Sequence, residues 1–285
     1  MRALIEEERR QFHKSLLSNQ VLTIDSFGVP SNADRASELS KFVARHIANK
    51  LLAEVHEKIQ GQTSGAKFEQ INMEFLMATF PNLQLLRPGK WHIEKLGNRS
   101  SLKTSNFVQY AHLEALNEFV RQNAELAASL GNDYMVAPDI VVYREPEEDE
   151  EINSKRQLVN AGVSNLSDIR KSFNPLPILH ASISAKWTIR SDRAQNSRTE
   201  ALGLIRNRKG HLPHIVVVTA EPMPSRLASL ALGTGDIDCV YHFALPELQE
   251  AVEASGAEDA KEMLKILVEG RRLKDISDLP LDLTV

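Results

Sequence analysis

The chain has 285 residues, of which 42% are hydrophobic and 25% are charged, a composition typical of one large globular domain or two small ones. Its single cysteine, Cys239, excludes an internal disulfide and any zinc site built from several cysteines, so we expect a reducing, cytoplasmic location. No apolar run approaches the ~20 residues that a membrane helix needs, which argues against a membrane partner.

Charge is distributed unevenly along the sequence. The formal net charge of −4 argues mildly against nucleic-acid binding, because domains that bind nucleic acid are usually basic. However, residues 145–151 carry six carboxylates, whereas residues 186–209 carry seven basic side chains and only two acidic ones. Local charge decides counterion release from a nucleic acid, so the basic segment keeps that class of partner open.

The first half of the sequence is predicted to be mainly helical. Apolar residues at helical spacing predict helices over residues 1–17, 35–57, 66–80 and 105–130. Gly61-Gln62-Thr63-Ser64-Gly65 is predicted to be a tight polar loop before the third of these helices. Weak alternation of polar and apolar residues over residues 91–96 predicts the first strand.

Strands and helices alternate in the second half of the sequence. The predicted strands cover residues 140–144, 179–190, 215–218 and 239–243, and the predicted helices cover 193–207, 224–232, 246–254 and 258–269. This alternation predicts an α/β fold in which helices on both faces flank a central mixed β-sheet. No linker separates two folding units, so we expect a single domain over residues 1–285.

Residues 146–175 interrupt this regular pattern with a polar insert. The sequence there predicts at most a short helix, near residues 163–172. An irregular segment of this length is uncommon in a compact domain, and such segments often make contacts with partners.

Two residues on neighbouring predicted strands suggest a metal-dependent phosphodiesterase. Hydrolysis of a phosphodiester at neutral pH needs a divalent cation, hard oxygen ligands and a positive group near the developing charge. Asp139 follows Pro138 at the start of a strand and supplies a hard ligand, while Lys186 supplies the positive charge. The position two before such a lysine is commonly acidic, but here it is Ser184, which is a poor metal ligand.

A second ligand must therefore come from elsewhere in the chain. Glu200 and Glu69 are the candidate carboxylates, and the backbone carbonyl of Ala185 is a further candidate ligand. A Pro-Asp pair more often opens a turn, and an isolated glutamate more often lies at the surface. The residues that flank Lys186 are apolar: Ile183, Ala185, Trp187 and Ile189. They predict a buried strand, and a lysine is rarely buried without a partner, which favours a functional lysine.

Arg190, Ser191, Asp192 and Arg193 lie where this strand is predicted to lead into a helix. One interpretation is a solvated helix cap with salt bridges, the usual arrangement for such charges. The other is direct reading of DNA, because arginine donates two hydrogen bonds to guanine and aspartate accepts one from cytosine. Two arginines and one aspartate would suit adjacent G·C pairs in the major groove.

Taken together, these motifs resemble those of the type II restriction endonucleases that recognise CCGG-centred sites. The residues that carry the resemblance are Pro138-Asp139, Ser184-Ala185-Lys186, Arg190-Ser191-Asp192-Arg193 and Glu200. The similarity extends over nearly the whole chain, from Glu8-Arg9-Arg10 to the segment 272–281.

The resemblance implies a PD-(D/E)xK nuclease fold and assigns a role to each candidate residue. The implied catalytic residues are Asp139, Lys186 and Glu200, with Glu69 and Ser184 beside them. The implied ligands of Mg²⁺ are Asp139, Ala185, Glu200 and Glu69. The implied DNA-binding residues are Arg190, Asp192 and Arg193 with Ser191 at the CCGG core, Gln62 in the minor groove and Arg226 at the outer pair.

The resemblance further implies cleavage of double-stranded DNA at GCCGGC after the first G, leaving a four-base 5′ overhang. It implies a homodimer or homotetramer, with tetramer contacts from the insert 146–175, and a cognate DNA methyltransferase as functional partner. The sequence departs from the family pattern around Arg35, where Ala36 or Ser37 would replace a serine that helps read the outer pair. Two alternatives are a catalytically silent DNA-binding protein of the same fold and a repair nuclease that recognises DNA structure.

Overall fold

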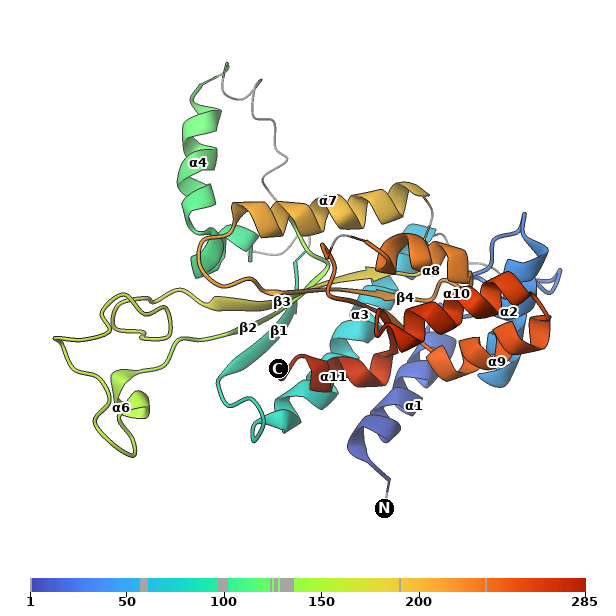
Figure 1. Ribbon diagram of the computed structural model, residues 1–285, viewed down its shortest axis with the longest axis horizontal. Helices are drawn as coiled ribbons and strands as arrows, with labels where there is room; N and C mark the ends of the chain where they lie inside the picture. The colour runs from blue at the N-terminus through green and yellow to red at the C-terminus, as the bar shows by residue number, and fades with distance from the viewer. Residues whose placement is uncertain are drawn as a thin grey trace. The chain divides into compact units, whose positions relative to one another are not determined.

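A computed structural model describes residues 2–56, 61–96, 102–123, 125, 128, 136–189, 191–233 and 235–285, and only the backbone of residues 61, 62 and 191–194 (Figure 1). Backbone contacts gather the chain into two compact units. The first unit comprises Met1–Leu83, Ile183–Arg198 and Ile215–Val285, and the second comprises Gln84–Ser182 and Thr199–His214.

The strands form one six-stranded sheet in the order β1-β2-β3-β4-β5-β6. Their bounds are β1 Trp91–Lys95, β2 Ile140–Arg144, β3 Ile178–Lys186, β4 His214–Thr219, β5 Cys239–His242 and β6 Leu273–Asp275. β1 pairs with β2 antiparallel, whereas β4, β5 and β6 run parallel. The predicted α/β fold with a mixed sheet flanked by helices is confirmed.

The helices of the first unit cover its strands with one apolar face each. They are α1 Leu4–Ser18, α2 Glu38–Lys50, α3 Gly61–Thr79, α8 Pro224–Ala231, α9 Leu245–Ser255, α10 Glu258–Glu269 and α11 Leu279–Asp282. α1 packs beside α3, α2 beside α9 and α8 beside α10 (Figure 1). Across the part of the chain that the structure describes, each helix is too short or too polar to span a bilayer.

Arg9 on α1 fastens this unit internally. Its guanidinium donates to Asp275 at 2.8 Å and 3.0 Å and to Glu247 at 2.7 Å and 3.1 Å. Asp275 also accepts the backbone N–H groups of Leu245 and Ser277, each at 3.0 Å. One arginine therefore joins α1, the start of α9 and the end of β6.

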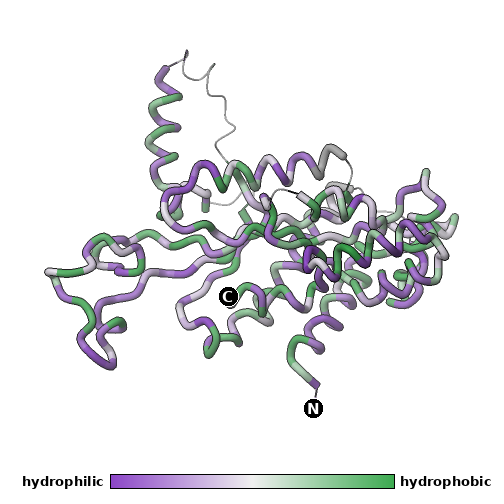
Figure 2. Tube along the Cα trace, in the orientation of Figure 1, coloured by the Kyte–Doolittle hydropathy of each residue, from purple (hydrophilic) through white to green (hydrophobic). Residues whose placement is uncertain are grey.

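In the second unit, α4 (His112–Arg121) and α6 (Asp149–Ile152) accompany β1 and β2. Two single 3-10 turns, Thr104–Asn106 and Val108–Tyr110, precede α4. The tube of α4 alternates between hydrophilic and hydrophobic colours along its length (Figure 2), as expected of a helix with one buried face. α7 (Ser191–Asn207) begins in the first unit and ends in the second.

Five predicted boundaries were wrong. Residues 61–65 form the first turn of α3 rather than a loop, and the helix predicted over 105–130 is, among the described residues there, mainly α4 after two 3-10 turns. The short helix of the insert lies at Asp149–Ile152 instead of 163–172. β3 ends at Lys186 rather than residue 190, and α2 runs over Glu38–Lys50 rather than residues 35–57.

Candidate active site

Lys186 is the last residue of a buried strand. The residues of β3 from Leu179 to Ala185 are all buried, and the side chain of Ile183 has no exposed surface. Lys186 itself is half-buried at the point where the strand ends. Ser184 is 9% exposed and lies two residues earlier, on the same face of the strand. The predicted burial of this strand is confirmed.

The end of β3 is anchored to α3 by an aromatic contact. The ring of Trp187 meets the ring of Phe68 edge-on, with their centroids 5.1 Å apart, and also contacts Phe243 at 5.7 Å. Both Phe68 and Trp187 are buried. Glu69 follows Phe68 and Lys186 precedes Trp187, so this contact holds the backbone of both candidate residues in one part of the first unit. Glu69 is half-buried.

Asp139 lies immediately before β2 in the second unit. Its backbone carbonyl accepts the N–H of Leu96 at 3.2 Å, which extends the antiparallel pairing of β1 and β2 by one residue. The preceding Pro138 is buried, while Asp139 is half-buried. The sheet therefore fixes the backbone of the aspartate and leaves its carboxylate partly accessible.

Glu200 lies on α7, in the second unit. Ser197, Ala201 and Leu204 form the buried face of this helix, and Glu200 is half-buried at its edge. The hydroxyl group of Tyr110 donates to the carbonyl of Leu204 at 3.1 Å and so fixes the helix within its unit. The structure thus brings Glu69, Ser184, Ala185 and Lys186 into the first unit, while Asp139 and Glu200 belong to the second.

The structure does not describe the side chains of most of the predicted DNA-reading residues. Arg190 lies outside the described residues altogether. Ser191, Asp192 and Arg193 form the first turn of α7, and Gln62 lies in the first turn of α3, but only their backbone is described. Their predicted roles therefore stay predictions.

Arg226 is the one predicted reader with a described side chain. Its guanidinium pairs with Asp34 and lies 3.8 Å from a carboxylate oxygen of Glu221. Arg226 and Asp34 help to line a cavity of about 170 Å³, together with Thr188 near the end of β3. Ser37 is the N-cap residue of α2, because its hydroxyl oxygen accepts the N–H of Ser40.

Glu221 was missed in the sequence. It lies two residues after the end of β4 and its side chain is almost completely buried, with 1% exposed. One carboxylate oxygen accepts the N–H of Ile189 at 2.9 Å, and the other accepts the N–H of Met223 at 3.1 Å. Burial raises the pKa of the Glu221 carboxyl to about 7, although these hydrogen bonds and the charge of Arg226 oppose the rise. The sequence signal is an acidic residue placed three positions after the apolar run Ile215–Val218.

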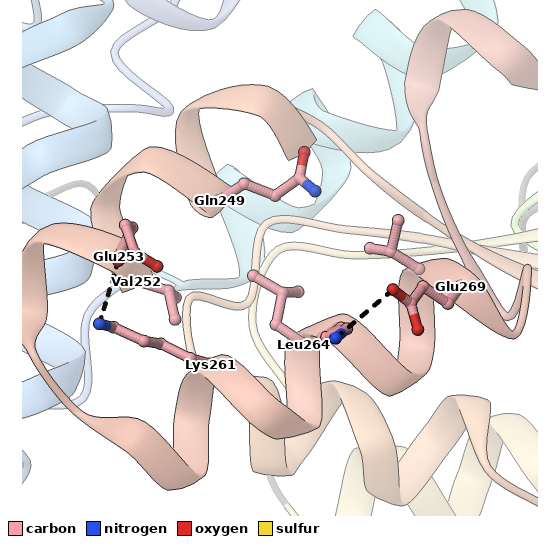
Figure 3. Close-up of a pocket in the computed structure, with 8 residues that line it drawn as sticks. Gln249, Val252, Glu253, Lys261, Leu264 and Glu269 are labelled. Carbon is pink, nitrogen blue, oxygen red and sulfur yellow. Dashed lines mark hydrogen bonds and ion pairs between the residues drawn. The ribbon is translucent and has the colours of Figure 1, made fainter.

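A larger hollow, of about 280 Å³, lies between α9 and α10 and holds none of the candidate residues (Figure 3). Val252 and Leu264 form its apolar floor, and Lys261 pairs with Glu253 across it at 3.1 Å. Its lining consists of the apolar and charged side chains that two amphipathic helices normally present to each other, so we do not assign a catalytic site to this hollow.

The candidate metal ligands fit a hard cation. The carboxylates of Asp139, Glu69 and Glu200 and the carbonyl of Ala185 are oxygen donors, the type that Mg²⁺ prefers. All three residues are half-buried; Glu69 lies in the first unit, and Asp139 and Glu200 lie in the second. Within the described part of the chain, no three His, Cys, Asp or Glu residues, the three candidate carboxylates included, are grouped so that they could hold a metal ion.

The whole sequence was compared with known proteins. Residues 12–285 match the family described as NgoMIV restriction enzyme. The type II restriction enzyme NgoMIV of Neisseria gonorrhoeae is 52% identical over 286 residues, and the alignment covers 100% of both chains. The alignment covers the whole chain, and the predicted resemblance is confirmed. The chain therefore belongs to the NgoMIV restriction enzyme family and is a type II site-specific DNA endonuclease.

Proposed function

We propose that the chain is a Mg²⁺-dependent endonuclease that cuts double-stranded DNA at GCCGGC after the first G and leaves a four-base 5′ overhang. The observation that carries this proposal is the half-buried Lys186 at the end of a buried strand, held beside the Glu69 segment by the Phe68–Trp187 contact. A lysine in that position places a positive charge at a fixed point, which suits the negative charge that develops on a phosphate in the transition state.

In this mechanism Asp139, Glu200 and Glu69 would hold the cation together with the carbonyl of Ala185. When bound, the cation polarises the scissile phosphate and lowers the pKa of a bound water. Lys186 stabilises the attacking hydroxide and the charge that develops on the phosphate oxygens.

Recognition of the site is assigned to two groups of side chains. Arg190, Asp192 and Arg193, with Ser191, read the CCGG core from the major groove, and Gln62 contacts the minor groove. The pairing of Arg226 with Asp34 supports an outer G·C pair, since arginine donates to guanine and aspartate accepts from cytosine.

A palindromic site requires at least a dimer, and we extend the proposal to a tetramer through the insert 146–175. Two features of the second unit support this. Arg170 is buried and its guanidinium donates to Asp149 at 2.9 Å and 2.5 Å, which orders the insert from within. The insert also exposes large apolar side chains, namely Leu158, Val163, Leu166 and Phe173. The enzyme would work in the cytoplasm alongside a cognate DNA methyltransferase.

Digestion of mapped plasmids tests the proposal. We expect plasmids with GCCGGC to be cut in Mg²⁺ and left intact in EDTA, and sequenced ends should show a 5′-CCGG overhang. A plasmid with two sites should be cut faster than one with a single site if two DNA copies are bound. Specific binding without cleavage would instead favour the silent DNA-binding protein, and cleavage without a sequence preference would favour the repair nuclease.

A further inference from the structure

Three segments of the first unit meet at the end of β4. The amide nitrogen of Asn32 donates to the carbonyl of Ala220 at 2.8 Å. The next residue, Glu221, accepts the N–H of Ile189 with one oxygen and the N–H of Met223 with the other. Loop 31–34, the segment that follows β3 and the start of α8 are thus all hydrogen-bonded to Ala220 or Glu221.

Each of these segments leads to a residue that the proposed function places on DNA. Ile189 immediately precedes the Arg190–Arg193 group in the sequence. Met223 is the N-terminal cap residue of α8, which carries Arg226. Asn32 lies two residues before Asp34, the partner of Arg226. The inner and outer base readers therefore share one buried point of attachment.

We propose, on the basis of the function proposed above, that Glu221 is a positioning residue that fixes the inner-pair and outer-pair readers relative to each other and so sets the stringency of site recognition. Glu221 has no exposed path to DNA and acts through the backbone of Ile189 and Met223. This role is separate from catalysis and from direct reading of bases.

The chemistry requires a carboxylate. An ionised carboxylate has two acceptor oxygens and can receive both N–H groups, whereas glutamine or a protonated acid keeps only one oxygen free of hydrogen. The charged or titratable groups around Glu221 are Arg226, Asp34 and the buried His242. The pKa of Glu221 is raised by burial to about 7, so the two-acceptor form is lost as the pH falls through this value.

The test compares the wild-type enzyme with Glu221→Gln on duplexes that contain GCCGGC or a variant with the outer or inner pair changed. The quantity measured is the ratio of kcat/KM for the cognate duplex to that for each variant. We expect the substitution to lower this ratio by about tenfold, the effect of losing one hydrogen bond to a charged acceptor. In the wild type the ratio should fall between pH 8 and pH 6, while in Glu221→Gln it should stay flat.

Asp275→Asn is the matched control. Asp275 is also a buried carboxylate that accepts two backbone N–H groups beside an arginine, but the segments it holds carry no proposed reader. This variant should lose stability and keep the wild-type discrimination ratio. An equal loss of discrimination in both variants would mean general loosening of the fold and would overturn the proposal.

A ratio in Glu221→Gln within twofold of the wild type would also overturn it. If that variant does not fold, the wild-type pH profile decides, because a ratio that is flat from pH 6 to pH 8 rules out the role. Failure of the wild type to cut GCCGGC at all would be visible in the same assay and would reject the proposed function itself.

Discussion

Replacing Glu221 by glutamine should change how protein stability depends on pH. Burial raises the pKa of this carboxyl to about 7, against 4.5 for an ordinary glutamate, which we take for the unfolded chain. Between these values the folded state binds a proton that the unfolded state has released. The wild type therefore loses stability as the pH rises from 4.5 to about 7, and the loss then stays constant. The difference between the two pKa values corresponds to about 3 kcal/mol.

Glutamine does not titrate, so Glu221→Gln lacks this dependence. The wild type should therefore be more stable relative to the variant at pH 5 than at pH 8, by about 3 kcal/mol. Urea unfolding at both pH values, followed by tryptophan fluorescence, measures the free energy of unfolding of each protein. A difference between the proteins that is equal at pH 5 and pH 8, or larger at pH 8, would refute the argument.

Four further substitutions test other parts of the structure. Asp139→Ala should abolish cleavage and keep specific binding, and a variant that cuts at the wild-type rate in gel assays would remove Asp139 from the mechanism. Arg193→Ala should lose about 1–3 kcal/mol of discrimination at one G·C pair, measured by binding to substituted duplexes; a uniform loss on all duplexes would indicate phosphate contact instead. Arg9→Met should lower the free energy of unfolding by about 3 kcal/mol at pH 7, because it leaves Asp275 and Glu247 as unpaired, largely buried carboxylates. Burial raises the pKa of Asp275, but the hydrogen bonds and charge of Arg9 lower it, and the lowering prevails. The loss of stability in Arg9→Met should therefore shrink as the pH falls and Asp275 is protonated. A loss of stability that grows in acid would contradict the ion-pair explanation. If the proposed tetramer forms, Arg170→Met should disorder the insert and reduce the tetramer fraction in sedimentation experiments, and an unchanged fraction would exclude the insert as its contact.

The sheet could be predicted because its strands carry a strong local signal. Ile215 to Val218 form an unbroken apolar run, and Ile140 to Val142 do the same, so burial on both faces was evident from composition alone. Lys186 stood out for the same reason, as a charge inside a segment whose neighbours are apolar. The prediction of a nuclease site depended on the apolar strands, on Lys186 and on the family motifs.

Other elements have no comparable local signal. β6 consists of Leu273, Lys274 and Asp275 and is a strand only because it pairs with β5. The first turn of α3 contains two glycines and polar residues, and it is helical because the helix it belongs to packs against α1. Tertiary contacts decide both cases.

The role of Glu221 could not be predicted for a related reason. A glutamate after an apolar strand is ordinarily solvated, and nothing in its neighbours indicates that Ile189 and Met223 will donate to it. The N–H groups that donate to Glu221 belong to Ile189, 32 residues away, and Met223, 2 residues away. Only the bond to Ile189 shows that the carboxylate connects two distant segments of the chain.

α7 is a single helix that begins with the Ser191-Asp192-Arg193 turn and carries Glu200 nine residues later. At 1.5 Å per residue these positions are about 13 Å apart along one stiff axis. Given the roles proposed here, a mismatched base pair that displaces the tip must also displace a ligand of the metal. Non-cognate sites would then be rejected by the rigidity of α7, without a hinge or a closing loop.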